Sequence, residues 1–180
     1  MRIIARKTLR DFYAHHADSR ASLEAWFHEA ATARWRAPQE IKNRYPSADI
    51  LPGNRVVFNI KGNTYRLIVK IHYNTGIVFI RFVGTHAAYD KIDATTIQPQ
   101  TMRAKIIKTE EDYTGALAHV ESLMEARPGS PKEEELELWS LLVERYEQER
   151  FPIDLPGPVE AFKFRMEQEG LQQKDLVKYF

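Results

Sequence analysis

Three runs of β-branched and aromatic residues, separated by very short turns, constrain the fold of this 180-residue chain more than any other feature. The runs are RVVFNIKG, TYRLIVKIHY and GIVFIRFVG, at residues 55–62, 64–73 and 76–84. Connections this short can only join antiparallel neighbours, so the sequence predicts a three-stranded meander. A sheet of this size is stable in water only when at least one of its faces is covered.

The residues before the meander are expected to supply that cover. A short strand at residues 1–5 precedes two segments, 6–16 and 19–35, in which apolar residues recur at helical spacing. Residues 44–54 contain two prolines and a glycine and are expected to form a turn-rich connection. The expected fold class is therefore α+β, with an antiparallel sheet covered by two helices at the N-terminus, followed by an all-α region.

The second half of the chain shows no strand pattern after Thr109. Helices are predicted over residues 109–126, 130–150, 159–170 and 172–180. Thr109 precedes a run of acidic residues and Ser130 precedes a proline, and both patterns are typical of helix N-termini. The predicted organisation is one domain at residues 1–97, a junction at 98–108 and a helical region at 109–180.

The near-neutral total charge conceals an uneven distribution. Residues 1–97 carry 15 Lys and Arg against 8 Asp and Glu, a balance of +7, whereas residues 102–180 carry 11 against 17, a balance of −6. This division favours two surfaces that attract each other, or a nucleic-acid-facing module beside its electrostatic counterpart. The alternative is a chance asymmetry between two solvated surfaces.

Several classes of protein are not expected from the composition. The chain has no cysteine, so disulfide frameworks and thiolate metal sites are excluded. It contains no Gly-rich phosphate loop and no histidine pair at metal-ligand spacing, so we predict no metal and no cofactor. No stretch approaches the roughly 20 apolar residues of a membrane span. The expectation is a soluble, cytoplasmic protein.

Polar and charged side chains along the meander and at its exit are candidates for a site. RNA cleavage needs a base for the 2′-hydroxyl proton, cations for the charge on phosphorus, and an acid for the leaving oxygen. Arg66, Arg81 and Lys61 suit the charge-stabilising role. The proton-transfer roles suit three residues that follow the last strand, namely His86, Tyr89 and Asp90. Each also has a structural interpretation, as a cap for His86 or Asp90 and as a core ring for Tyr89.

The meander and its exit resemble HigB toxins of the RelE-like mRNA interferase superfamily. The resemblance is carried by RVVFNIKGNTYRLIVKIHY and IVFIRFVGTHAAYDKID, which match the patterns FN-x-x-GN-x-x-R and R-x-x-x-TH-x-x-YD. It implies a ribosome-dependent endoribonuclease that cleaves translated mRNA. The implied catalytic residues are Arg66, Arg81, His86 and Tyr89. The implied substrate-binding residues are Asn59, Lys61, Lys70 and Asp90.

The helical half resembles the N-terminal part of HigA-type antitoxins. That resemblance rests on IKTEEDYTGALAHVESLME and FKFRMEQEGLQQKDL. It implies a toxin fused to its antitoxin, inhibited within one chain or by exchange between two chains of a homodimer. The family's helix-turn-helix would continue beyond Phe180, so binding to operator DNA is not expected. The alternative function is a transcriptional autorepressor, or an interaction module whose toxin half is inactive.

Overall fold

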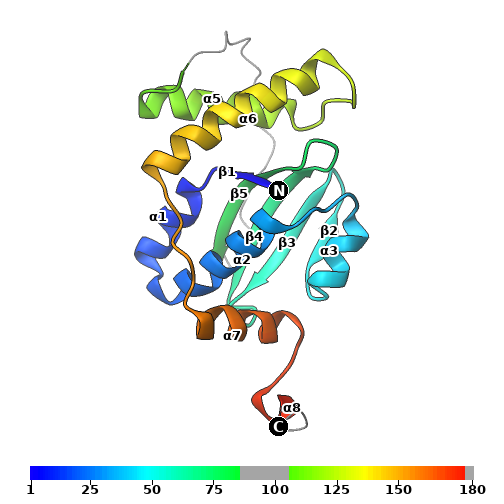
Figure 1. Ribbon diagram of the computed structural model, residues 1–180, viewed down its shortest axis with the longest axis vertical. Coiled ribbons are helices and arrows are strands. Elements are labelled where there is room, and N and C mark those ends of the chain that lie inside the picture. Colours follow the sequence, from blue (N-terminus) through cyan, green and yellow to red (C-terminus); the bar gives the residue numbers. More distant parts are fainter. Residues whose placement is uncertain (86–105, 177–180) are drawn as a thin grey trace.

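The computed structural model describes residues 1–85 and 106–176 (Figure 1). Five strands and the first helices come from the N-terminal half, and the later helices follow in the C-terminal half. In chain order the elements are β1 (Arg2–Ile4), α1 (Lys7–His15), the 3-10 helix η1 (Ala17–Ser19), α2 (Arg20–Thr32), α3 (Pro38–Arg44), β2 (Asp49–Leu51), β3 (Arg55–Ile60), β4 (Tyr65–His72), β5 (Ile77–Thr85), α5 (Glu110–Leu123), α6 (Pro131–Arg150), α7 (Pro158–Gln168) and α8 (Gln173–Leu176).

The strands form one sheet in the order β1-β5-β4-β3-β2. The predicted meander is present, because β3, β4 and β5 pair antiparallel in succession. The prediction of an antiparallel sheet was wrong in one respect: β1 pairs parallel to β5, with Ile3 opposite Val78, and the sheet is mixed. A three-residue strand carries no pattern that indicates its direction. The direction of β1 is set in the assembled sheet, where the strand lies beside β5 and its residues Ile3 and Ile4 are buried.

The segment expected to be an irregular connection contains regular structure. Residues 49–51 form β2, which pairs antiparallel with β3. Before it, Pro38 opens α3, a third helix beside the two that were expected, and Lys42 and Arg44 lie in its last turn. Proline is favourable in the first turn of a helix, and lysine and arginine are favourable in its last turn. The strand β2 was not predictable by alternation, because none of its three residues is fully buried.

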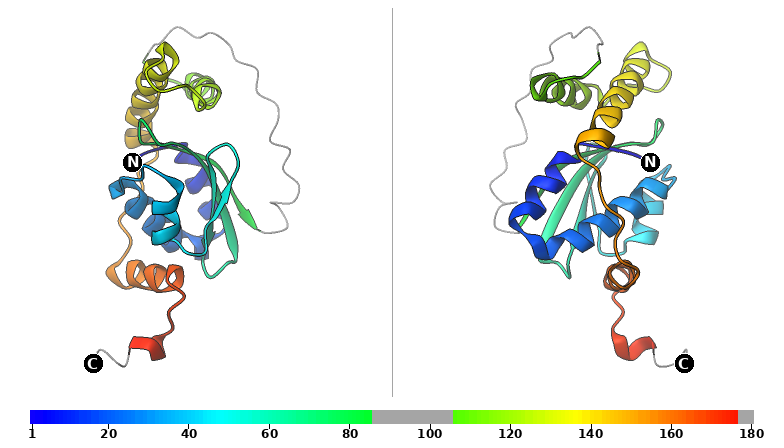
Figure 2. Two further views of the ribbon diagram at one scale, coloured as in Figure 1. Left: turned by 90° about the vertical axis from the view of Figure 1, so that its right-hand side faces the viewer. Right: turned by 60° about the vertical axis from the view of Figure 1, so that its left-hand side comes forward.

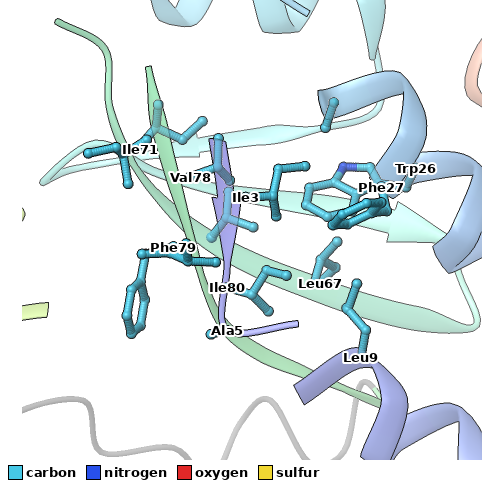
Figure 3. Packing of buried hydrophobic residues seen from close by; sticks show 14 of the residues in the cluster. Ile3, Ala5, Leu9, Trp26, Phe27, Leu67, Ile71, Val78, Phe79 and Ile80 are labelled. Atoms are coloured by element: carbon cyan, nitrogen blue, oxygen red, sulfur yellow. The ribbon is translucent and has the colours of Figure 1, made fainter. Parts of the chain in front are cut away.

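Helices α1, α2 and α3 lie against one face of the sheet (Figure 2). Phe58 of β3 stands opposite Leu67 of β4 on that face, and both are fully buried. The Phe58 ring lies 5.4 Å from Trp26 and 5.0 Å from Tyr45, measured between ring centroids. Leu9 of α1 and Trp26 lie beside Leu67 (Figure 3). We call this the covered face of the sheet.

Because successive residues of a strand alternate in direction, the neighbours of the buried residues point to the other side. This side, here called the second face, carries Asn59 of β3 and Arg66, Ile68 and Lys70 of β4. Three of these four side chains are polar. The second face is therefore the place where the strands present most of their candidate functional groups.

The C-terminal helices lie at opposite ends of the sheet (Figure 1). α5 and α6 pack together near the β4–β5 turn, and α7 packs against α2 at the other end. The predicted helix starts are confirmed: Thr109 and Asp112 form a capping box, and the Ser130 hydroxyl accepts a hydrogen bond from the backbone N–H of Glu133. Tyr113 and Trp139 belong to the same buried cluster as the sheet residues, so the two halves share a core.

Opposite charges meet where the two halves touch. The guanidinium of Arg20 lies 2.6 Å from the Asp154 carboxylate, and that of Arg2 lies 2.9 Å from Glu144. Arg165 of α7 pairs in the other direction with Glu29, at 2.8 Å. Some of the excess basic residues of the first half thus pair with acidic residues of the second half. Pairs at this level of exposure contribute about 0–1 kcal/mol each.

One carboxyl group at this contact is fully buried. Glu147 of α6 accepts hydrogen bonds at Oε1 from the Tyr113 hydroxyl, at 2.5 Å, and from the backbone N–H of Arg6, at 2.9 Å. The guanidinium Nε of Arg6 lies 3.6 Å from Oε2. Burial raises the pKa of Glu147 to about 7, although these partners favour its charged form. The residue links α5, α6 and the segment after β1.

Glu147 makes the stability of the chain depend on pH. In the folded chain its pKa is about 7, against 4.5 for an unburied glutamate, so the folded state binds more protons between these values. The free energy of unfolding therefore falls as pH rises from 4.5 to 7. Between about pH 5 and about pH 8, the free energy of unfolding of Glu147→Gln should fall by about 1–3 kcal/mol less than that of the natural chain. The measurement is urea unfolding at both pH values.

The matched control is Glu149→Gln, which removes a carboxylate from the exposed side of the same helix. This variant should keep the pH dependence of the natural chain. If Glu147→Gln and Glu149→Gln lost stability equally over this range, the assignment of the effect to Glu147 would be wrong.

Candidate functional site

Arg66 is positioned by two asparagines. The register of β3 and β4 places Asn59 directly opposite Arg66. The Arg66 guanidinium donates hydrogen bonds to the side-chain oxygens of Asn59 and Asn63. The Asn59 amide donates in turn to the backbone oxygen of Ser47, at 3.1 Å, which fixes its orientation. The structure thus brings two of the predicted residues, Asn59 and Arg66, into contact.

Asn63 was not among the predicted site residues. It lies in the β3–β4 turn with a φ of 80°, a left-handed conformation that asparagine tolerates better than most residues. This geometry allows the turn to fold back toward Arg66, three residues later. The Gly-Asn pair at residues 62–63 indicated a turn in the sequence, but no sequence pattern indicated the contact.

Lys61 is directed to a different partner. Its ammonium group pairs with the carboxylate of Asp18 in η1, which also accepts from the Tyr65 hydroxyl at 3.0 Å. The hydrogen bond from Lys61, followed by that from Tyr65, lowers the pKa of Asp18. Tyr65 belongs to the buried cluster of the covered face. The structure therefore does not bring Lys61 together with Arg66.

Arg81 and Lys70 lie on the second face together with Arg66. Lys70 is four residues after Arg66 on β4, about 13 Å along the strand. The pairing of β4 with β5 shifts register at Ile68, where Phe82 is the partner of Ile68 and Ile80 is the partner of Val69. Arg81 is the extra residue of this bulge, so Arg81 and Phe82 both oppose Ile68 and point to its face.

Two carboxylates, from Glu121 in α5 and from Glu125 in the turn that follows it, cover these cations. Glu121 lies 2.6 Å from the Arg81 guanidinium, and Glu125 lies 2.7 Å from the Lys70 ammonium. The Lys70 side chain is only 6% exposed, whereas that of Glu125 is 74% exposed. The hydrogen bond and charge of Lys70 lower the pKa of Glu125, and the charges of Arg55 and Arg81 add to this effect. No sequence pattern assigned these glutamates to the sheet.

α7 contacts the sheet at its other end, beside the β3–β4 turn. The amide of Gln168 donates to the backbone oxygen of Asn59, at 2.9 Å, and Glu167 accepts from the backbone N–H of Gly62, at 3.2 Å. Both contacts lie at the β3–β4 turn that holds Arg66. The helical half thus contacts the candidate site at both ends.

Three predicted residues, His86, Tyr89 and Asp90, lie outside the described residues. The last described residue before them is Thr85, at the end of β5. Thr85 stands opposite Tyr65, next to the pair formed by Arg66 and Gly84. The chain therefore leaves the sheet at the end where Arg66 lies.

The comparison with known proteins identifies this part of the chain. A family model described as HigB_toxin, the RelE-like toxic component of a toxin-antitoxin system, matches residues 19–92. The match indicates a HigB/RelE-like toxin domain in the N-terminal half. Over 92 residues the chain is 28% identical to the mRNA interferase toxin HigB of Escherichia coli K12 and to the mRNA interferase HigB of Shigella flexneri. Each match covers 50% of this chain and 88% of the relative.

The N-terminal half is therefore homologous to HigB mRNA interferase toxins. The same comparisons give no evidence for a HigA-type antitoxin in the helical half. That resemblance, and the domain boundaries drawn from it, stay predictions. Within the described residues, no helix is long and apolar enough to cross a membrane.

The contacts of Glu125 lead to a prediction about its titration. Lys70→Met should raise the pKa of Glu125 toward its ordinary value, because the largest cause of its lowering is removed. Arg81→Met should raise it by less, because Arg81 acts only through its charge. The measurement is an NMR titration of the side-chain carboxyl carbons.

Lys7→Met serves as the control, since Lys7 pairs with Asp11 and Glu110 instead. It should leave the titration of Glu125 unchanged. A larger effect from Arg81→Met than from Lys70→Met would contradict the assigned order of causes.

Proposed function

We propose that the N-terminal half is a ribosome-dependent endoribonuclease that cleaves translated mRNA, and that the helical half restrains it. The observation that supports this most directly is the placement of Arg66 and Arg81 on one face of the sheet, in a domain homologous to HigB mRNA interferases. Two guanidinium groups on one face suit a reaction that builds negative charge on phosphorus.

The proposed reaction uses the RNA 2′-hydroxyl as nucleophile. A base removes its proton, the oxygen bonds to phosphorus, the bond to the 5′-oxygen breaks, and an acid gives that oxygen a proton. Arg66 and Arg81 would stabilise the charge on the phosphate oxygens. His86 or Tyr89 would transfer the proton. Asn59, Lys61, Lys70 and Asp90 would bind the substrate.

The contacts of Arg66 support its role in this scheme. Guanidinium groups bind phosphate through paired N–H donors in a planar fork, so their orientation matters. Asn59 and Asn63 accept hydrogen bonds from this guanidinium before any substrate arrives. Groups that are oriented in advance stabilise a transition state without reorganising during the reaction.

The helical half is proposed to act as the antitoxin of this toxin. Its support is the set of contacts described above: Glu121 and Glu125 at the cations of the second face, and Glu167 and Gln168 at the backbone of the β3–β4 turn region. Glu147 adds a buried anchor, because it accepts a hydrogen bond from the backbone N–H of Arg6. Each of these contacts can be made within one chain, so the proposed restraint needs no exchange between two chains.

Arg66→Ala tests the endoribonuclease proposal. Residues 1–97 and the full chain, each with and without this change, would be added to a reconstituted translation system, and mRNA cleavage would be mapped by primer extension. We expect the isolated half to cleave more than the full chain, and Arg66→Ala to reduce cleavage about 10²-fold or more, because one charge-stabilising donor is lost.

Arg34→Ala is the matched control, since it removes an exposed guanidinium beyond the end of α2. It should cleave as the natural chain does, and circular dichroism would verify that each form is folded. Cleavage that does not respond to Arg66→Ala, or no cleavage by any folded form, would refute the proposal.

A further inference from the structure

We propose that Arg55 and Lys70 form a second phosphate-binding subsite for single-stranded RNA beside Arg81, and that Glu121 and Glu125 occupy the cations of this cluster in place of phosphate groups. The inference rests on the proposed function, because that function supplies RNA as the ligand. It goes further by assigning a binding site away from the scissile bond and a competitor within the chain.

The three cations come from three adjacent strands of the second face. Arg55 of β3 stands directly opposite Lys70 of β4, and Lys70 stands opposite Phe79 of β5, two residues before Arg81. Lys70 lies about 13 Å along β4 from Arg66, and Arg81 opposes Ile68, midway between them. A strand of RNA whose scissile phosphate lies at Arg66 can therefore continue along the same face to reach these cations.

The two carboxylates contact the cluster as phosphate oxygens would. Carboxylate and phosphate groups both accept short, charge-assisted hydrogen bonds from guanidinium and ammonium groups. Glu121 and Glu125 do so at 2.6 and 2.7 Å. Glu121 lies in the last turn of α5 and Glu125 in the turn that follows it, so the end of this helix places two anions beside the cluster.

The cluster also has unused capacity for an acceptor. The Nε of Arg55 is buried and has no hydrogen-bond partner among the residues that the structure describes. Two carboxylates thus serve three cations incompletely. A buried donor without an acceptor is unfavourable, so a ligand with further acceptor oxygens is favoured there once the Arg55 side chain turns toward it. A phosphodiester backbone is such a ligand.

The accessibility of the two glutamates differs, and this determines how RNA enters. Glu125 is 74% exposed, so rotation of its side chain is enough to open the Lys70 ammonium to a phosphate. Glu121 and Arg81 are each 17% exposed, so that pair opens only when α5 shifts. RNA should therefore replace Glu125 first and Glu121 second.

The test measures RNA binding by the full chain, separately from cleavage. The probe is a short, fluorescently labelled single-stranded RNA with 2′-O-methyl groups, which lacks the nucleophile and is not cut. Binding would be measured by fluorescence anisotropy at several salt concentrations. Each cation that becomes free to bind phosphate should steepen the slope of log K against log salt by about 0.7.

We expect Glu125→Gln to bind the probe more tightly than the natural chain, with a slope of log K against log salt that is steeper by about 0.7. The double variant Glu121→Gln/Glu125→Gln should make this slope steeper by up to about 1.4. The matched control, Glu111→Gln/Glu137→Gln, removes the same net charge from exposed positions of α5 and α6 and should leave the slope unchanged. Adding Lys70→Met to Glu125→Gln should return the slope to that of the natural chain.

Equal slopes for the Glu125→Gln variant and the control would overturn the subsite, as would a gain that survives Lys70→Met. The single variant keeps the test decisive if the double variant does not fold. Failure of the proposed function looks different: the slopes would change as expected while no form of the chain cleaved mRNA. Cleavage that depends on Arg66, together with unchanged slopes, would refute the subsite alone.

Discussion

The alternation of β3, β4 and β5 is the constraint on which the rest of the structure depends. Phe58 and Leu67 must point to the covered face, because burial of large apolar side chains contributes about 1.5–3 kcal/mol each. The side chains of their neighbours Asn59 and Arg66 must then point to the second face. The bulge at Ile68 adds Arg81 to the same face. The apolar core on one side thereby assembles the cations on the other.

The sequence predicted the parts of the fold that have a clear period. The meander alternates over strands of six to nine residues, and α5 and α6 begin at recognisable caps. β1 and β2 have three residues each, too few to carry a period or a direction. The parallel pairing of β1 is decided by which edge buries Ile3 and Ile4, a property of the assembled sheet and not of the segment.

The candidate site was predictable to a similar extent. Alternation placed Arg66 and Lys70 on one face, but Arg81 joins them only through the register shift, which no local pattern reveals. Lys61 follows β3 in sequence, yet a φ of 52° directs it to Asp18 on η1. The contacts of Glu121 and Glu125 depend on where α5 packs. Charge counting gave attraction between the halves as one of three interpretations, and it did not indicate which residues meet.

The proposed restraint combines two interactions of unequal strength. Val120 of α5 and Met124 at its C-terminal cap are fully buried, and burial of side chains of this size contributes several kcal/mol in total. The ion pair of Glu125 is largely exposed and contributes about 1 kcal/mol or less. Apolar packing therefore keeps α5 in place, while the carboxylates decide whether the cations beneath are available. Phosphate can then compete for Lys70 without separating the halves, whereas access to Arg81 requires displacement of the helix.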